Sequence, residues 1–115
     1  MMPPPSRQDV FEHIERKRDV LTICEGKRDV LALRRLGFSR VQEIDRPLYE
    51  VVERIEKGST VQLLTDLDAE GKKLFSRLNS DLRQRGVHMD NELRELLFRT
   101  DLRQIEGLDT WLQRR

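Results

Sequence analysis

Two aspartates separated by a single residue, Asp66 and Asp68, follow an apolar run at residues 61–64 and precede an amphipathic stretch at residues 72–85. The run predicts a buried strand, because it is short and a turn signal at residues 57–59 bounds it. The stretch repeats its apolar residues at spacings of three and four, which is typical of a helix. The two aspartates therefore lie at the carboxyl end of a strand, at the edge where open α/β sheets bind ligands.

Carboxylates at alternate positions of an extended segment point the same way, and two like charges this close repel unless a cation lies between them. A hard divalent cation is their natural counterpart, and we expect Mg²⁺. The alternative is structural: Asp68 would be only the N-cap of the following helix, and Asp66 an ordinary loop acid. The aspartate pair alone does not separate these two interpretations.

The other segments alternate between strand and helix patterns. We expect strands at residues 20–24, 41–44, 61–64 and 86–89, and helices at residues 6–17, 27–36, 47–58, 72–85, 90–97 and 105–112. This alternation predicts an α/β fold with a mostly parallel four-stranded sheet in the order 2-1-3-4 and helices on both faces. An extra N-terminal helix and a helical C-terminal tail complete the expected architecture.

That strand order makes the first and third strands neighbours. Glu25, which ends the first strand, would then meet Asp66 and Asp68 in one crevice. Three carboxylates at one place have the composition of a metal site.

Glycines and cations flank the three acids. Gly26 and Gly71 would let the main chain approach a phosphate closely. Cations in the first turn of a helix oppose the helix dipole by about 0.3–1 kcal/mol each, so their presence suggests an anionic ligand that offsets them. Four such cations occupy the first turns of the two helices that face this edge: Lys27, Arg28, Lys72 and Lys73.

Glu25-Gly26, followed by Thr-Asp-Leu-Asp-Ala-Glu-Gly at residues 65–71, resembles the Toprim family, whose domain is shared by topoisomerases, bacterial primases and some nucleases. The family pattern is glutamate-glycine at the end of the first strand and aspartate-x-aspartate at the end of the third. The resemblance is closest to small stand-alone Toprim proteins of archaea, and then to the ribosomal-RNA maturation ribonuclease. It implies a compact, Rossmann-like Toprim fold. It also implies that Glu25 is a general acid/base and metal ligand, and that Asp66 and Asp68 bind magnesium.

The resemblance implies Mg-dependent phosphodiester chemistry on nucleic acid, RNA in preference to DNA, as an RNA-processing, nuclease-like or phosphotransferase activity. The chain would not be a complete topoisomerase or primase, because its one tyrosine, Tyr49, lies in a helical pattern and one cysteine cannot build a zinc module. The alternative is a non-catalytic, Mg-dependent module that binds RNA or protein within a larger nucleic-acid complex. A partner protein would then complete the site. A phospho-aspartate switch is disfavoured, because such families place an aspartate where this chain has Glu25.

Composition sets broad limits. The 115 residues suit one domain, divided into an N-terminal tail and helix at residues 1–17, a Toprim core at 18–89 and a packed helical tail at 90–115. The formal net charge is +1, so nucleic acid would have to bind a local patch. A single cysteine, Cys24, excludes an internal disulfide. Because neither a secretion signal nor a membrane-length apolar run is present, we expect a cytoplasmic protein that does not bind membranes.

Overall fold

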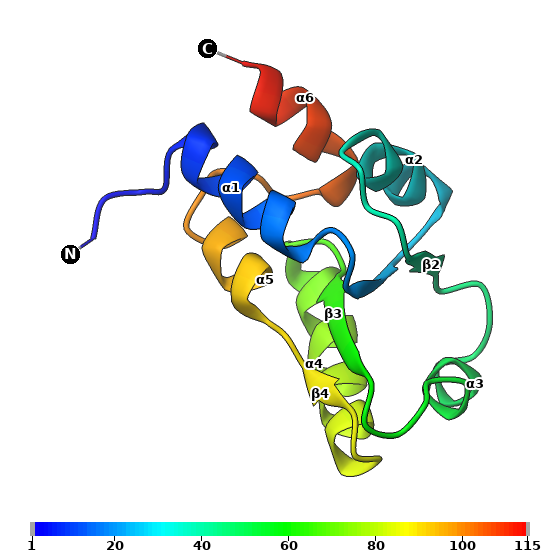
Figure 1. Ribbon diagram of the computed structural model, residues 1–115. Coiled ribbons are helices and arrows are strands. Elements are labelled where there is room, and N and C mark those ends of the chain that lie inside the picture. The colour runs from blue at the N-terminus through cyan, green and yellow to red at the C-terminus, as the bar shows by residue number, and fades with distance from the viewer. Residues whose placement is uncertain (1, 115) are drawn as a thin grey trace.

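In residues 2–114, which the computed structural model describes, four parallel strands form one sheet in the order β2-β1-β3-β4 (Figure 1). The predicted strand order is confirmed, and every strand pair is parallel. Strands buried on both faces are rich in apolar residues, and the central pair follows this rule except at the buried Thr22 and Gln62. The strands are β1 (Leu21–Cys24), β2 (Val41–Glu43), β3 (Thr60–Leu64) and β4 (His88–Met89).

Helices connect the strands and extend both ends of the chain. None of the helices in residues 2–114 has the length and apolar character needed to cross a bilayer. Their bounds are α1 (Arg7–Lys17), α2 (Lys27–Arg35), α3 (Leu48–Glu53), α4 (Ala69–Gln84), α5 (Glu92–Leu97), a 3-10 turn η1 (Ile105–Gly107) and α6 (Leu108–Gln113).

The helix boundaries follow local capping chemistry. Ser6 caps α1 as predicted: its Oγ accepts from the Asp9 N–H at 3.0 Å, and the Asp9 carboxylate accepts from the Ser6 N–H at 2.9 Å. Helix α4 begins at Ala69, three residues before the predicted start, because Asp68 caps it. The last predicted helix divides into η1 and α6.

Different helices cover the two faces of the sheet. One face of the sheet is the face to which Cys24 and Leu64 contribute. Helices α1, α2 and α5 pack on it, together with the chain after α5, residues 98–114, which we call the C-terminal segment. Helices α3 and α4 pack on the face to which Ile23 and Leu63 contribute. Consecutive strand residues point to opposite faces, so β1 and β3 each supply both clusters. The C-terminal segment belongs to the first cluster, in which Ile105 is fully buried.

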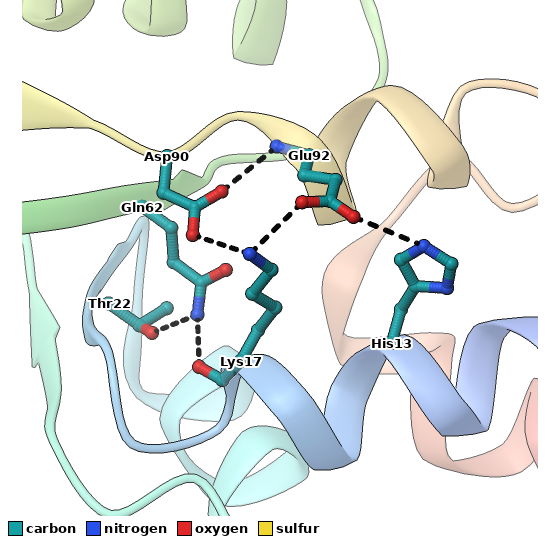
Figure 2. A network of polar contacts seen from close by, with 6 residues as sticks. All are labelled: His13, Lys17, Thr22, Gln62, Asp90 and Glu92. Carbon is teal, nitrogen blue, oxygen red and sulfur yellow. Dashed lines mark hydrogen bonds and ion pairs between the residues drawn. The ribbon is translucent and has the colours of Figure 1, made fainter.

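A polar network holds α1 on the sheet and on α5 (Figure 2). Gln62 Nε2 donates to the Lys17 main-chain oxygen at 2.8 Å and to Thr22 Oγ1 at 2.9 Å. Lys17 Nζ in turn pairs with Asp90 Oδ2 at 2.9 Å and with Glu92 Oε2 at 3.1 Å. Gln62 and Thr22 are buried, and these partners compensate Gln62 Nε2 and Thr22 Oγ1 for the loss of their contacts with water, whereas Gln62 Oε1 has no hydrogen-bond partner among the described residues.

Candidate functional site

Glu25 and Asp66 lie next to each other at the carboxyl edge of the two central strands. Cys24 and Leu64 are partners in the parallel register of β1 and β3, so the residues that follow them leave the sheet side by side. The Asp66 N–H donates to Glu25 Oε2 at 2.6 Å. The structure thus brings together two of the three acids that the sequence analysis placed in one site.

The C-terminal segment closes over the Asp66 loop. The Ile105 N–H, in η1, donates to Asp66 Oδ1 at 2.9 Å. The Leu67 N–H donates to the Arg103 main-chain oxygen at 2.7 Å. Residues from beyond α5 therefore position the acidic loop, although the site was expected from residues of the central core alone.

Asp68 is the N-cap of α4, and its Oδ1 accepts from the Gly71 N–H at 2.8 Å. The structural alternative is therefore correct about the position of Asp68. Asp68 is also close enough to the other two acids for its negative charge to raise the pKa of both Glu25 and Asp66. Asp68 thus starts the helix and adds charge to the same edge of the sheet.

Burial is the first cause that raises the pKa of the carboxyls at this edge. The pKa of Glu25 is raised by burial and then by the charges of Asp66, Asp29 and Asp68, while the hydrogen bond from the Asp66 N–H opposes the rise. The pKa of Asp66 is likewise raised by burial, against the hydrogen bond from Ile105. Neighbouring carboxyl groups that disfavour each other's ionised form are stabilised as carboxylates by a bound cation.

Asp29 is a further acid at this edge that was not among the predicted site residues. It is buried in the first turn of α2, where its Oδ2 accepts from the Gly26 N–H at 3.1 Å. Burial raises the pKa of Asp29, and the charges of Asp66 and Glu106 raise it further. The edge therefore carries more negative charge than the three-acid pattern implies.

The two glycines have different roles. A Cβ at Gly71 would lie 1.9 Å from the Asp66 main-chain oxygen, so the first turn of α4 packs directly on the acidic loop. Gly71 is buried and gives its N–H to Asp68, so the expected phosphate contact at Gly71 does not fit this geometry. Gly26 has no atom within 4 Å of an added Cβ, which leaves open space at the start of α2.

Arg94 is a buried residue of the site that the sequence analysis missed. It is 2% exposed, and its guanidinium lies 4.5 Å from the centroid of Phe75 and 5.0 Å from that of Phe98. Its Nη1 donates to the Thr65 main-chain oxygen at 2.6 Å and its Nη2 to that of Asp66 at 3.0 Å. Burial lowers the pKa of Arg94 to about 10, against the opposing effect of the nearby acids. The spacing of four between Arg94 and Phe98 in a helical pattern was the available signal.

The four predicted cations lie where expected, at the starts of α2 and α4, and all are exposed. Arg28 Nη1 is 4.0 Å from Glu106 Oε2, and Lys73 Nζ is 3.9 Å from Glu70 Oε1. Lys72 Nζ lies 5.4 Å from the ring centroid of Phe98. Contact of these residues, Lys27 included, with phosphate stays a prediction.

The donor chemistry at this edge suits an open magnesium site. Within residues 2–114, no three His, Cys, Asp or Glu side chains form a ready-made ligand set for one metal ion. Glu25, Asp66 and Asp68 each use one oxygen to accept a main-chain N–H, and the second oxygen of each has no hydrogen bond among the described residues. Mg²⁺ commonly keeps several waters and binds through one or two carboxylates together with substrate phosphates. The residues fit that kind of site better than a closed cage.

The fold is shared with a solved structure. A protein from Aquifex aeolicus superposes with a TM-score of 0.79 over 90% of this chain and 99% of that chain, at 23% identity. At this identity the likeness shows the α/β fold alone. No family model matches the chain.

Sequence relatives define the family. The UPF0292 protein of Methanosarcina barkeri is 32% identical over 103 residues, which cover 84% of this chain and 72% of that protein. The UPF0292 protein of Methanocaldococcus jannaschii is 31% identical, over 81% of this chain and 78% of that protein. The UPF0292 protein of Pyrococcus abyssi is 34% identical, over 82% of this chain and 73% of that protein. This chain belongs to the UPF0292 family.

Proposed function

We propose that this chain is a Toprim protein that performs magnesium-dependent phosphodiester chemistry on nucleic acid, with RNA as the preferred substrate. The observation that supports this proposal most strongly is the contact between Glu25 and Asp66 at the carboxyl edge of β1 and β3. Two acids that are 41 positions apart in the sequence meet there, beside the charge of Asp68. This arrangement agrees with the roles that the Toprim resemblance assigns to the three residues.

Each acid has a separate role in this proposal. Asp66 and Asp68 hold the magnesium ion, and Glu25 moves a proton to or from the oxygen nucleophile or leaving group. Bound magnesium supplies polarisation of the scissile phosphate and stabilisation of the developing charge. A proton-transfer group works best when its pKa lies near the working pH, so the raised pKa of Glu25 favours it as the acid/base.

Activity measurements with charge-neutral variants test the proposal. Wild type, Glu25→Gln and Asp66→Asn are incubated with structured RNA and with DNA, with and without magnesium. We expect turnover of RNA only with magnesium. Glu25→Gln should lose at least about 100-fold, the size typical of a lost acid/base group, and Asp66→Asn should lose turnover because it removes a magnesium ligand. Glu12→Gln is the matched control, because Glu12 is exposed on α1 and its carboxylate pairs with Gln8. Turnover that is indifferent to both site substitutions would refute the enzymatic assignment.

A second candidate is a non-catalytic module that binds RNA or a protein partner through magnesium. It is favoured by the observation that each of the three carboxylates already accepts a main-chain N–H, which gives the acids a structural role. Magnesium-dependent retention of RNA without turnover in the same incubations would select this module. A cytoplasmic location remains a prediction for both candidates.

A further inference from the structure

A cavity of about 330 Å³ lies between Asp68 and the C-terminal segment, and we call it the tail cavity. Its volume falls within the range of ~300–1,000 Å³ that is usual for small-ligand sites. Asp68 forms one wall, and Arg103, Gln104, Trp111 and Arg114 contribute from the segment that folds over the acidic loop. The cavity therefore adjoins the proposed magnesium site but is built mainly from residues that the proposed chemistry does not use.

The arginines of the tail cavity carry the recognition chemistry. Arg103 Nη1 donates to the main-chain oxygens of Thr100, at 3.0 Å, and Leu102, at 2.7 Å. This contact fixes the guanidinium in place, and its other nitrogens make no hydrogen bond among the described residues. Arg114 is exposed at the rim. Guanidinium groups are well suited to phosphate oxygens, which they contact in pairs.

Trp111 adds an aromatic side chain to the lining of the tail cavity. The Trp111 Nε1–H donates to Asp101 Oδ1 at 2.8 Å, and the Arg7 guanidinium lies 4.5 Å from the Trp111 ring centroid. The indole is therefore held by Asp101, which also lines the cavity, and by Arg7, which does not. Trp111 is 6% exposed, so only a small part of its ring faces the cavity. Nucleotide sites combine aromatic contacts of this kind with cations that contact the backbone.

We propose that the tail cavity binds one nucleotide of a nucleic-acid strand, and that Arg103 and Arg114 contact the phosphate of this nucleotide. The next phosphate of the same strand then reaches the acidic site. This inference rests on the proposed function, because Asp68 is shared by both sites. The charges of Asp68 and Asp101 offset the two arginines, and a cation at Asp68 removes part of that offset. Binding of magnesium and of the nucleotide unit is therefore mutually favourable.

The chain carries its own reporter for this test, because Trp111 is its only tryptophan. Trp111 emission is titrated with 5′-phosphorylated diuridylate, with the same dinucleotide lacking the 5′-phosphate, and with inorganic phosphate, each with and without magnesium. We expect the phosphorylated dinucleotide to bind about tenfold more tightly than the other two, the ratio that one charge-assisted hydrogen bond provides. We also expect magnesium to tighten its binding. Equal responses to all three probes, or none, would overturn the inference.

Variants separate the tail cavity from its surroundings. Arg114→Gln and Arg103→Gln are each expected to weaken binding of the phosphorylated dinucleotide about tenfold. Arg77→Gln is the matched control, because Arg77 is exposed on α4, where it pairs with Asp81 outside the cavity. Arg114→Gln removes an exposed side chain, so it tests the site even if Arg103→Gln disturbs the segment. Unchanged affinity in Arg114→Gln would refute the assignment.

Failure of this inference is distinguishable from failure of the proposed function. Asp66→Asn is expected to abolish turnover yet to keep the Trp111 response in magnesium-free buffer. Turnover that depends on Glu25 and Asp66, without any Trp111 response, would overturn the tail cavity alone. A phosphate-selective response without turnover in any condition would support the tail cavity and contradict the enzymatic proposal.

Discussion

The Asp66 N–H donates a hydrogen bond of 2.6 Å to Glu25 Oε2, across 41 positions of the sequence. This bond is a direct consequence of the strand order, since β1 and β3 are adjacent and parallel and their carboxyl ends meet at one edge. It holds the Glu25 carboxylate against the loop that carries Asp66 and Asp68. The position of Glu25 and the shape of the acidic loop are therefore coupled.

The two glycines of the site should respond differently to alanine. Gly71→Ala would place a Cβ 1.9 Å from the Asp66 main-chain oxygen, so we expect it to destabilise the fold by ~1–3 kcal/mol or more. Gly26→Ala meets no atom within 4 Å, and its extended backbone, with φ −152°, accepts any residue. We expect Gly26→Ala to lower the free energy of unfolding by well under half as much as Gly71→Ala does. Urea unfolding of both variants measures the difference, and equal losses would contradict the packing role of Gly71.

Arg94 should act as a structural support of the acidic loop. Arg94→Met keeps much of the apolar contact with Phe75 and Phe98 but leaves the main-chain oxygens of Thr65 and Asp66 without their donors. A buried group left without a partner costs ~1–3 kcal/mol, so the free energy of unfolding should fall by about that amount. Arg94→Lys should restore part of the loss, because it can replace one of the two donors. Full stability of Arg94→Met in urea would show that these bonds are dispensable.

The raised pKa values of Glu25 and Asp66 predict the sign of a pH effect on stability. The folded protein holds these protons more tightly than the unfolded chain, so stability falls as the pH rises from the ordinary carboxyl value towards the raised one. Glu25→Gln and Asp66→Asn each keep an acceptor oxygen but remove the charge. Each should raise the Tm by a few degrees at about pH 7 and have little effect at about pH 3, where the wild-type carboxyls are protonated.

Asp45 provides the control of opposite sign. Its pKa is lowered by the hydrogen bond from Arg46, so its ionised form is favoured in the folded protein. Asp45→Asn should therefore lower the Tm slightly at neutral pH, and this loss should vanish as the pH falls through the lowered pKa. Thermal unfolding across the pH range compares the three variants. Destabilisation by Glu25→Gln at neutral pH would contradict the electrostatic description of the site.

Cys24 should be inert in the folded protein. Burial, together with the charges of Asp29 and Glu43, raises its thiol pKa to about 12. Because the thiolate is the reactive form, a thiol reagent at about pH 8 should label Cys24 only after unfolding in urea. Mass spectrometry of native and unfolded samples measures the labelling. Prompt labelling of the native protein would show that β1 opens readily.

Much of the fold could be predicted because its signals are local. The runs at residues 20–24 and 61–64 are short, apolar and followed by helical patterns, which indicates neighbouring parallel strands. The contact between Glu25 and Asp66 follows from that order. The capping interpretation of Asp68 was also available from the sequence, and the earlier start of α4 is its consequence.

The remaining features depend on long-range packing. The hydrogen bond from Ile105 to Asp66 spans 39 positions and exists only because the tail folds back over the loop. Arginine is rarely buried, so the spacing of four between Arg94 and Phe98 is too weak a signal to predict that Arg94 lies between Phe98 and Phe75, on α4. The requirement for glycine at position 71 likewise depends on how closely α4 approaches the loop.

Calorimetric titration with magnesium tests the central claim most directly. We expect wild type to bind Mg²⁺ at millimolar concentration, more tightly with a short RNA present, since substrate phosphates complete the coordination of this ion. Asp66→Asn and Asp68→Asn should lose this binding while their circular dichroism stays native, and Glu12→Gln should bind as wild type does. Absence of magnesium binding by wild type, or equal binding by Asp66→Asn, would contradict a magnesium site at the carboxyl edge of β1 and β3.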